Sequence, residues 1–164
     1  MQVTLKGENL ETIGTPIALD AKMPEFEVKD QTGNIQSSNN LFNRISLISV
    51  VPNINTSVCS VSTKHFNQDV DKFSDINFYT ISTNTPEEQK NWCAAEGVDK
   101  MVLLSDDEHD FGKKSGLFIQ TAGIDARSVW VVDETGKVLY REIISEITDY
   151  PNYEAALNFL ASLS

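Results

Sequence analysis

The chain has 164 residues, with 24 acidic and 13 basic side chains, a formal net charge of −11 and a pI of about 4.5. This length fits a single domain spanning residues 1–164, and a hydrophobic content of 40% is enough for an ordinary buried core. The excess of negative charge repels phosphate groups, so nucleic acids and anionic membrane surfaces are poor candidates for partners.

Short strands are predicted in the first part of the chain, where brief β-prone runs flank turn residues. These runs are Gln2–Lys6 and Glu11–Ile13, which form a hairpin around Gly7-Glu8-Asn9, followed by Phe26–Lys29 and Asn34–Ser37 around Asp30-Gln31-Thr32-Gly33. Ile45–Val51 is continuously apolar, which predicts a strand buried on both faces. This strand ends at Pro52.

Each of the two cysteines lies on a predicted helix. From Cys59 onward apolar residues recur at helical spacing, so Cys59 is expected to face inward near the start of a helix. The residues that share its stripe are Phe66, Val70 and Phe73. A second helix, Pro86–Gly97, has proline at its start and glycine at its end, and it carries Cys93.

The remaining elements continue the alternation of strand and helix. They are the strand Ile76–Ser82, the strand Met101–Leu104, the helix His109–Ser115, the strand Ser128–Val132, and, after the turn Asp133-Glu134-Thr135-Gly136, the strand Lys137–Ile144. A final helix follows Pro151, with one face formed by Tyr153, Ala156, Leu157, Leu160 and Ala161. This order predicts an α/β sandwich with a central mixed β-sheet flanked by helices and an N-terminal β-hairpin, resembling a thioredoxin-like core.

The chain has two cysteines, Cys59 and Cys93, and two are too few for a disulfide framework or a thiolate metal cluster. Met1–Leu10 has neither the charged start nor the apolar stretch of a secretory signal, so we expect a cytoplasmic location, in which thiols stay reduced. A thiol becomes a strong nucleophile when it ionises, and a helix N-terminus favours negative charge. Position alone slightly favours a reactive Cys59 over a small buried hydrophobic residue.

The residues around both cysteines resemble the peroxiredoxin family. Pro52, Thr56 and Cys59 have the spacing Pro-x-x-x-Thr-x-x-Cys of the peroxiredoxin active-site motif. The wider similarity is to the thiol peroxidase branch, of the atypical two-cysteine type, and it covers nearly the whole chain. The segments that carry it are Ser49–Pro52, Thr56–Cys59, Phe66-Asn67, Asn91–Gly97, Ala126-Arg127, Asp133–Val138, Glu146–Thr148 and Pro151–Leu157.

This resemblance implies a thioredoxin-dependent peroxidase that reduces hydrogen peroxide and alkyl or lipid hydroperoxides. It implies that Cys59 attacks the peroxide and becomes a sulfenic acid, which Cys93 resolves as an intramolecular disulfide. Thr56 and Arg127 are expected to stabilise the thiolate and the peroxide oxygens, and Pro52 to shield the sulfur. The resemblance also implies a homodimer and no cofactor, whether metal, haem or flavin.

Other interpretations of the same residues remain open. Thr56 fits a helix N-cap, Pro52 the end of a strand, and Arg127 a solvated side chain at a strand edge. The two cysteines also fit a peroxide-responsive redox sensor or binding module that uses the disulfide as a switch, or a structural domain with inert thiols. The oxygen-stabilising residues favour the enzyme, because a switch needs two thiols only.

Three further expectations follow from the sequence. The acidic run Asp106–Asp110 lacks the spacing of a calcium loop and is interpreted as a solvated loop, and His65 as a surface residue. Asp125 stands two positions before Arg127 and is expected to pair with it and weaken its effect on Cys59. Because a disulfide needs Cα atoms within ~7 Å, the turns around both cysteines are expected to unwind during turnover.

Overall fold

The computed structural model describes residues 1–163, without the side chains of residues 57 and 58. The strands are β1 (Gln2–Leu5), β2 (Glu8–Glu11), β3 (Glu27–Lys29), β4 (Ile35–Ser37), β5 (Ser46–Val50), β6 (Asn77–Ser82), β7 (Val102–Ser105), β8 (Phe118–Ile119), β9 (Ile124–Asp125), β10 (Ser128–Val132) and β11 (Val138–Ile143). The helices are α1 (Ser38–Leu41), α2 (Ser57–Asp69), the 3₁₀ turn η1 (Val70–Lys72), α3 (Pro86–Glu96), α4 (Asp110–Ser115) and α5 (Tyr153–Ser162).

The centre of the molecule is a mixed seven-stranded sheet in the order β11-β10-β5-β6-β7-β3-β4. The middle strands β5, β6 and β7 are parallel, and antiparallel strands complete both sides. β5 is buried at every position, as its apolar run predicted. Two small hairpins, β1-β2 and β8-β9, lie outside this sheet.

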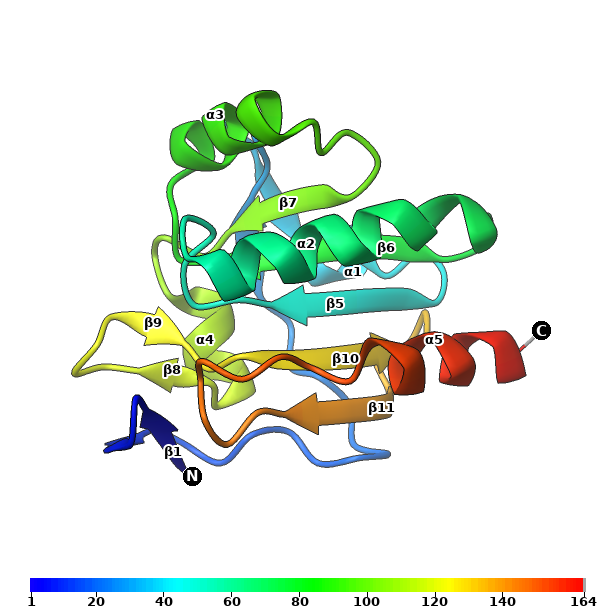
Figure 1. The fold of residues 1–164 in the computed structure, drawn as a ribbon. Coiled ribbons are helices and arrows are strands. Elements are labelled where there is room, and N and C mark those ends of the chain that lie inside the picture. Colours follow the sequence, from blue (N-terminus) through cyan, green and yellow to red (C-terminus); the bar gives the residue numbers. More distant parts are fainter. Residues whose placement is uncertain (164) are drawn as a thin grey trace.

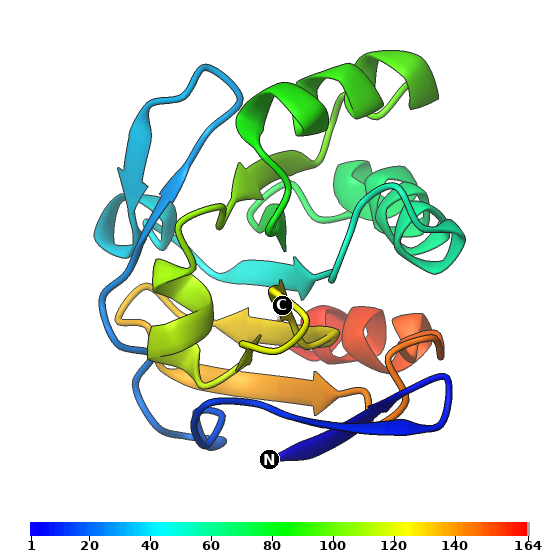
Figure 2. The same cartoon turned by 90° about the vertical axis from the view of Figure 1, so that its left-hand side faces the viewer.

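Helices cover both faces of the sheet (Figures 1 and 2). Figure 2 shows α2, α3 and α5 on one side and α1 and α4 on the other. Each side has its own apolar core: Phe66, Trp92 and Leu160 pack on the first, and Phe26, Phe111 and Trp130 on the second. The predicted sandwich with a central mixed sheet and an N-terminal hairpin is confirmed.

The predicted N-terminal hairpin turn was too long. The loop consists of Lys6 and Gly7 alone, and Glu8 pairs with Leu5 inside the hairpin. Both loop residues have positive φ, 51° and 83°, the backbone conformation that two-residue hairpin loops require. A consequence is that Lys6 stands at the tip of the hairpin.

Several short elements were missed by the sequence prediction. Helix α1 is a single turn capped by the Ser37 side chain, and β8 and β9 are strands of two residues each, too short to give a periodic pattern. At the other end of the chain, Ala156 and Leu160 are buried in α5 as expected, whereas Ala161 is exposed.

Candidate active site

The candidate site lies where β5 and β6 end and β10 begins, at the left of Figure 1. β5 and β6 are parallel, so the loops that follow them leave the same edge of the sheet. Ser128, the first residue of β10, pairs with Val50, the last residue of β5. The neighbouring Arg127 therefore stands beside the loop that leads from β5 to Cys59.

Helix α2 begins two residues earlier than predicted. Thr56 is its N-cap, and its side-chain oxygen accepts a hydrogen bond from the Cys59 backbone N–H at 3.4 Å. The same hydroxyl donates to the Asn53 carbonyl at 2.9 Å. The N-cap interpretation of Thr56 is thus correct, and it places Cys59 inside the first helical turn, where backbone N–H groups favour negative charge.

Arg127 contacts the sulfur of Cys59. Its Nη2 donates to Cys59 Sγ at 3.1 Å, while its Nε donates to the Ile147 carbonyl at 2.7 Å. Cys59 is fully buried and Arg127 is 3% exposed, so the pair meets away from bulk water, where charge interactions are strong. The interpretation of Arg127 as a solvated side chain is therefore wrong.

A pocket of about 390 Å³ opens beside this pair. We call it the Arg127 pocket; it is lined by Leu5, Lys6, Pro52, Asn53, Thr56, Ile124, Arg127, Ile147 and Thr148. The Nη1 atom of Arg127 is buried without a hydrogen-bond partner among the described residues. A polar ligand atom in the pocket would satisfy this donor, since buried donors are normally paired.

Glu146 fastens the N-terminal hairpin to the wall of the Arg127 pocket. One carboxylate oxygen accepts from Gly7 N and Thr4 Oγ1, and the other accepts from the N–H and hydroxyl groups of Thr148. The hydrogen bonds from Thr148, followed by that from Gly7, lower the pKa of Glu146 to about 2. The carboxylate is thus ionised at neutral pH, when it accepts these bonds.

The expected pairing of Asp125 with Arg127 is wrong. Asp125 is fully buried, and neither of its carboxyl oxygens accepts a hydrogen bond from a donor among the described residues. The carboxyl group of Asp106 is its charged neighbour, and burial followed by this neighbour raises the pKa of Asp125 well above its ordinary value. The raised pKa favours the neutral acid form of Asp125, and Arg127 contacts Cys59 rather than this carboxyl group.

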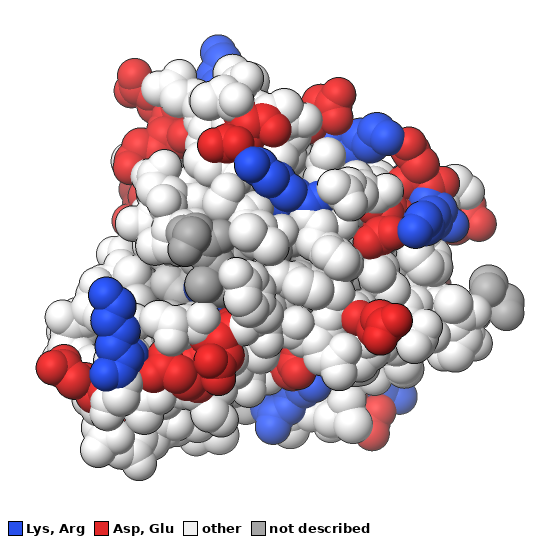
Figure 3. All heavy atoms as spheres, viewed as in Figure 1, with Lys and Arg blue, Asp and Glu red and all other residues white. Residues whose placement is uncertain are grey.

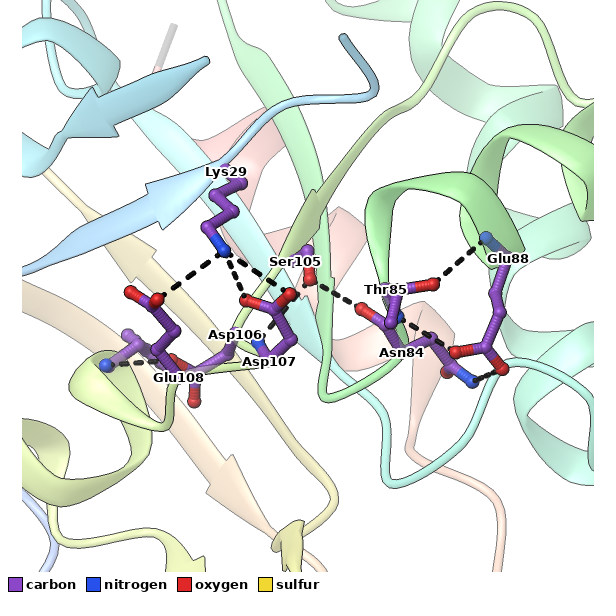
Figure 4. Close-up of polar contacts among 9 residues, drawn as sticks. Lys29, Asn84, Thr85, Glu88, Ser105, Asp106, Asp107 and Glu108 are labelled. Atoms are coloured by element: carbon purple, nitrogen blue, oxygen red, sulfur yellow. Dashed lines mark hydrogen bonds and ion pairs between the residues drawn. The ribbon is translucent and has the colours of Figure 1, made fainter. Parts of the chain in front are cut away.

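The acidic run Asp106–Asp110 is structured rather than merely solvated. Asp106 is 2% exposed and accepts the backbone N–H groups of Phe111 and Gly112 at 2.9 Å each. Lys29 forms ion pairs with Asp107 and Glu108 (Figure 4). Over residues 1–163 no group of histidine, cysteine, aspartate and glutamate side chains has the geometry of a metal site.

Cys93 lies in the last turn of α3, and its thiol is free, as is that of Cys59. The side chain is 9% exposed, and Gln31 Nε2 donates to its sulfur at 3.4 Å. Burial raises the pKa of the Cys93 thiol, and the bond from Gln31 opposes that rise. No local pattern indicates this contact, because Gln31 is 62 residues away in the chain.

Asn84 links the loop before Cys59 to the helix that carries Cys93. Its Oδ1 accepts from the buried Ile54 N–H at 2.8 Å, and its Nδ2 donates to Asn53 Oδ1 at 3.2 Å. Figure 4 shows Asn84 next to the start of α3, where Thr85 and Glu88 form a capping box. Its place directly after a parallel strand was an available signal that the sequence analysis missed.

His65 is not simply a surface residue. Its ring stacks on that of Tyr153 with centroids 4.1 Å apart, and Tyr153 also shares a hydrogen bond of 2.9 Å with Ser62. These contacts hold the middle of α2 against the start of α5. Tyr153 is thus a second residue near the site that the sequence analysis assigned only to a helix face.

The surface fits the charge balance of the chain. On the face shown in Figure 3, basic side chains lie among acidic ones rather than in a continuous basic patch. None of the helices within residues 1–163 has the length and apolar character needed to cross a membrane.

The chain is similar to known proteins in both sequence and structure. The AhpC/TSA family model matches residues 19–141. A thiol peroxidase from Bacillus subtilis is 37% identical over 163 residues, covering 99% of this chain and 98% of the relative, and one from Oceanobacillus iheyensis is 38% identical over 159 residues, covering 96% and 97%.

Two solved structures share the fold over almost the whole chain. The structure of a peroxiredoxin-like protein from Aquifex aeolicus superposes with a TM-score of 0.92 at 28% identity, covering 99% of this chain and 97% of the other. A thiol peroxidase from Chromobacterium violaceum superposes with a TM-score of 0.89 at 18% identity, covering 99% and 96%. The thioredoxin-like fold predicted from the sequence is confirmed.

The chain therefore belongs to the AhpC/TSA family. Within that family it is a peroxiredoxin of the thiol peroxidase branch, as the residues around its cysteines predicted.

Proposed function

We propose that this enzyme reduces hydrogen peroxide and alkyl or lipid hydroperoxides with Cys59, and that Cys93 then forms a disulfide with Cys59 which thioredoxin reduces. The observation that carries the proposal is the contact of 3.1 Å between the Arg127 guanidinium and Cys59 Sγ beside an open pocket. A permanent cation at this distance stabilises the thiolate, which is the reactive form of a cysteine.

In the first step the Cys59 thiolate attacks the outer oxygen of the hydroperoxide. The S–O bond forms as the O–O bond breaks, so sulfur is oxidised to the sulfenic acid and the other oxygen leaves as an alcohol or water after taking a proton. Negative charge builds on the leaving oxygen. The unpaired Nη1 of Arg127 is the donor in place for it, and the Thr56 hydroxyl joins it by exchanging its bond to the Asn53 carbonyl for one to the peroxide, with Pro52 shielding the sulfur from water.

The lining of the Arg127 pocket supports organic hydroperoxides as substrates. Leu5, Ile124 and Ile147 contribute apolar side chains, and Arg127 and Thr56 contribute polar groups. An alkyl chain can rest on the apolar wall while the peroxide group meets Arg127, which is the usual arrangement of a small-molecule site.

In the second step the Cys93 sulfur attacks the sulfenic sulfur of Cys59. The S–S bond forms, the S–O bond breaks, and the hydroxyl group leaves as water with the proton that Cys93 gives up. Both cysteines lie in terminal turns of their helices, the first turn of α2 and the last turn of α3. These turns are the parts of a helix that open at least cost, which supports local unwinding as the way the sulfurs meet.

The rest of the proposal concerns the setting of this cycle. Residues 1–164 act as one domain without a metal, haem or flavin, in the cytoplasm, and two chains form a homodimer. Dissolved hydroperoxide and thioredoxin are the partners, whereas nucleic acid and membrane are not, which agrees with the net charge of −11.

Peroxide consumption by the wild type, Cys59→Ser and Cys93→Ser, with either dithiothreitol or thioredoxin as reductant, tests the proposal. We expect Cys59→Ser to be inactive, and Cys93→Ser to keep turnover with dithiothreitol but lose it with thioredoxin. Normal turnover by Cys59→Ser would refute the mechanism. A wild type that forms the disulfide once but does not turn over would favour the redox sensor instead.

Hydrogen exchange tests the unwinding independently. Amide protection around both cysteines is expected to be lower in the disulfide form than in the reduced form. Equal protection in the two forms would contradict local unwinding.

A further inference from the structure

The β3-β4 turn, Asp30–Gly33, is fixed by its own hydrogen bonds. Asp30 Oδ1 accepts from Thr32 N, Thr32 Oγ1 and Asn34 N, at 2.9, 2.6 and 3.1 Å. Gly33 has a φ of 85° and closes the turn by donating to the Asp30 carbonyl at 3.0 Å. The hydrogen bond from Thr32 lowers the pKa of Asp30, so these acceptors persist at neutral pH.

This turn carries Gln31 onto the sulfur of Cys93. Gln31 is half-buried, and its Nε2 donates to Cys93 Sγ at 3.4 Å, within the range of a hydrogen bond to sulfur. The backbone carbonyl of Cys93 is already used, because it accepts from Gly97 and Val98 at the end of α3. The amide of Gln31 is therefore a polar contact made specifically to the thiol.

We propose that Gln31 assists the resolving step: its side-chain amide holds the Cys93 sulfur at the end of α3 and donates to it as it gives up its proton. This inference rests on the proposed role of Cys93. In the step itself the Cys93 thiol releases its proton to solvent and the anionic sulfur attacks the Cys59 sulfenic sulfur; the S–S bond forms as the S–O bond breaks, and the leaving hydroxide takes up a proton from solvent to become water. A donor that is already in place favours the anionic form over the neutral one.

The electrostatic need for such a donor is specific to Cys93. Cys59 has a guanidinium at 3.1 Å, whereas the hydrogen bond to the Cys93 thiol comes from a neutral amide, and burial raises the pKa of that thiol. The neutral amide of Gln31 is the group that opposes this burial effect. Gln31 thus has at Cys93 part of the role that Arg127 has at Cys59.

The chain contains a matched control for this turn. Asp133-Glu134-Thr135-Gly136 repeats its chemistry, since Asp133 Oδ1 accepts from Thr135 N and Thr135 Oγ1 at 2.9 and 2.6 Å, and Gly136 has a φ of 86°. Glu134 occupies the position equivalent to Gln31 and is exposed. Substituting Glu134 therefore tests the effect of changing this turn position without touching a cysteine.

The experiment compares the wild type with Gln31→Leu, Gln31→Glu and Glu134→Leu. Reduced enzyme is mixed with one equivalent of hydrogen peroxide, and samples quenched with iodoacetamide are analysed by mass spectrometry for the Cys59 sulfenic acid and the Cys59–Cys93 disulfide. A second measurement follows the pH dependence of Cys93 alkylation when each substitution is combined with Cys59→Ser, so that Cys93 is the only thiol.

We expect Gln31→Leu to leave sulfenic acid formation unchanged and to slow disulfide formation at pH 7 about three- to tenfold, as the loss of one ordinary hydrogen bond implies. The midpoint of Cys93 alkylation should move to higher pH, and the slowing should disappear above that midpoint. Gln31→Glu should show a larger shift in the same direction, because it adds a like charge. Glu134→Leu should match the wild type.

The outcomes separate this inference from the proposed function. If the wild type forms the disulfide and both Gln31 variants match its rate and alkylation midpoint, the role of Gln31 is refuted and the role of Cys93 stands. Faster disulfide formation in the variants also refutes it, since Gln31 would then merely restrain α3. If the wild type forms no Cys59–Cys93 disulfide, the resolving step and the role of Gln31 fail together.

Discussion

The two cysteines are both buried, but they meet different donors. Cys59 receives an N–H from the charged guanidinium of Arg127 at 3.1 Å and lies beside the Arg127 pocket. Cys93 receives an N–H from the neutral amide of Gln31 at 3.4 Å and lies in the last turn of α3. Burial alone therefore does not define a reactive thiol; the charge of the donor and the access for a substrate distinguish the two positions.

The largest expected effect comes from removing the charged donor. Arg127→Gln should lower kcat/KM for hydrogen peroxide about 10²- to 10³-fold, as happens when one donor to a developing negative charge is lost. The kcat/KM of Arg127→Lys should lie between the values of the wild type and Arg127→Gln. Lysine keeps the positive charge but lacks the planar guanidinium that donates to both Cys59 and the Ile147 carbonyl. Stopped-flow measurement of the peroxide step gives the rates.

Arg141→Gln is the matched control for this prediction. Arg141 also donates to a backbone carbonyl, that of Ile17, but at an exposed site. Its substitution should leave the rate within about twofold of the wild type. If Arg127→Gln reacts as fast as Arg141→Gln, the two cysteine environments do not differ in the way proposed.

The second prediction concerns the residue that connects the two environments. Asn84→Ala leaves the buried Ile54 N–H without its acceptor, which should lower the free energy of unfolding by about 1–3 kcal/mol. Because Asn84 lies between the loop before Cys59 and the start of α3, both the peroxide step and the resolving step should slow. Urea denaturation and the single-turnover assay measure these effects.

Asn39→Ala serves as the control for Asn84. Asn39 is exposed and donates to Glu25 at 3.1 Å, so its loss should change the free energy of unfolding by less than about 0.5 kcal/mol. Should Asn84→Ala lose stability while both steps keep their wild-type rates, the link between the two sites would be structural only.

The sequence predicted the elements but not the contacts that connect them. A continuous apolar run was sufficient for β5, apolar residues at helical spacing for the helix of Cys59, and the proline and glycine at its ends for the helix of Cys93. The positions of Asn84 and Gln31 against these helices depend on residues 30 and 62 positions away, and no local pattern records such pairs. Arg127 was found through the resemblance to a family rather than through any property of its own segment.

Asp125 shows where local pattern misled. The spacing of two residues between Asp125 and Arg127 suggested that they pair on the same face of one strand. In the structure, however, strand β9 ends at Asp125 and β10 begins only at Ser128. The side chain instead packs against Gly112, at which a Cβ atom would lie 2.0 Å from Asp125 Oδ1. Alternation along a strand does not extend across a break between strands.

The smallest effect is expected from substituting Asp125, and this substitution tests whether its carboxyl group influences Cys59. In the folded protein the pKa of Asp125 is raised above its ordinary value of 3.8, mainly by burial and then by Asp106. Above pH 3.8 the unfolded chain releases this proton while the folded chain keeps it. Stability should therefore fall as pH rises toward the folded-state pKa, by at most about 1.4 kcal/mol per pH unit for one proton.

Asp125→Asn removes this dependence, because an amide donates to Asp106 without having to hold a proton. Urea denaturation between pH 5 and pH 8 should show a flatter profile for Asp125→Asn than for the wild type and a more stable variant at pH 8, with the exposed Asp75→Asn unchanged. The rate of the peroxide step at pH 7 should stay the same. A faster peroxide step would mean that Asp125 does restrain Arg127, and the difference between the two cysteines would then depend on this carboxyl group as well.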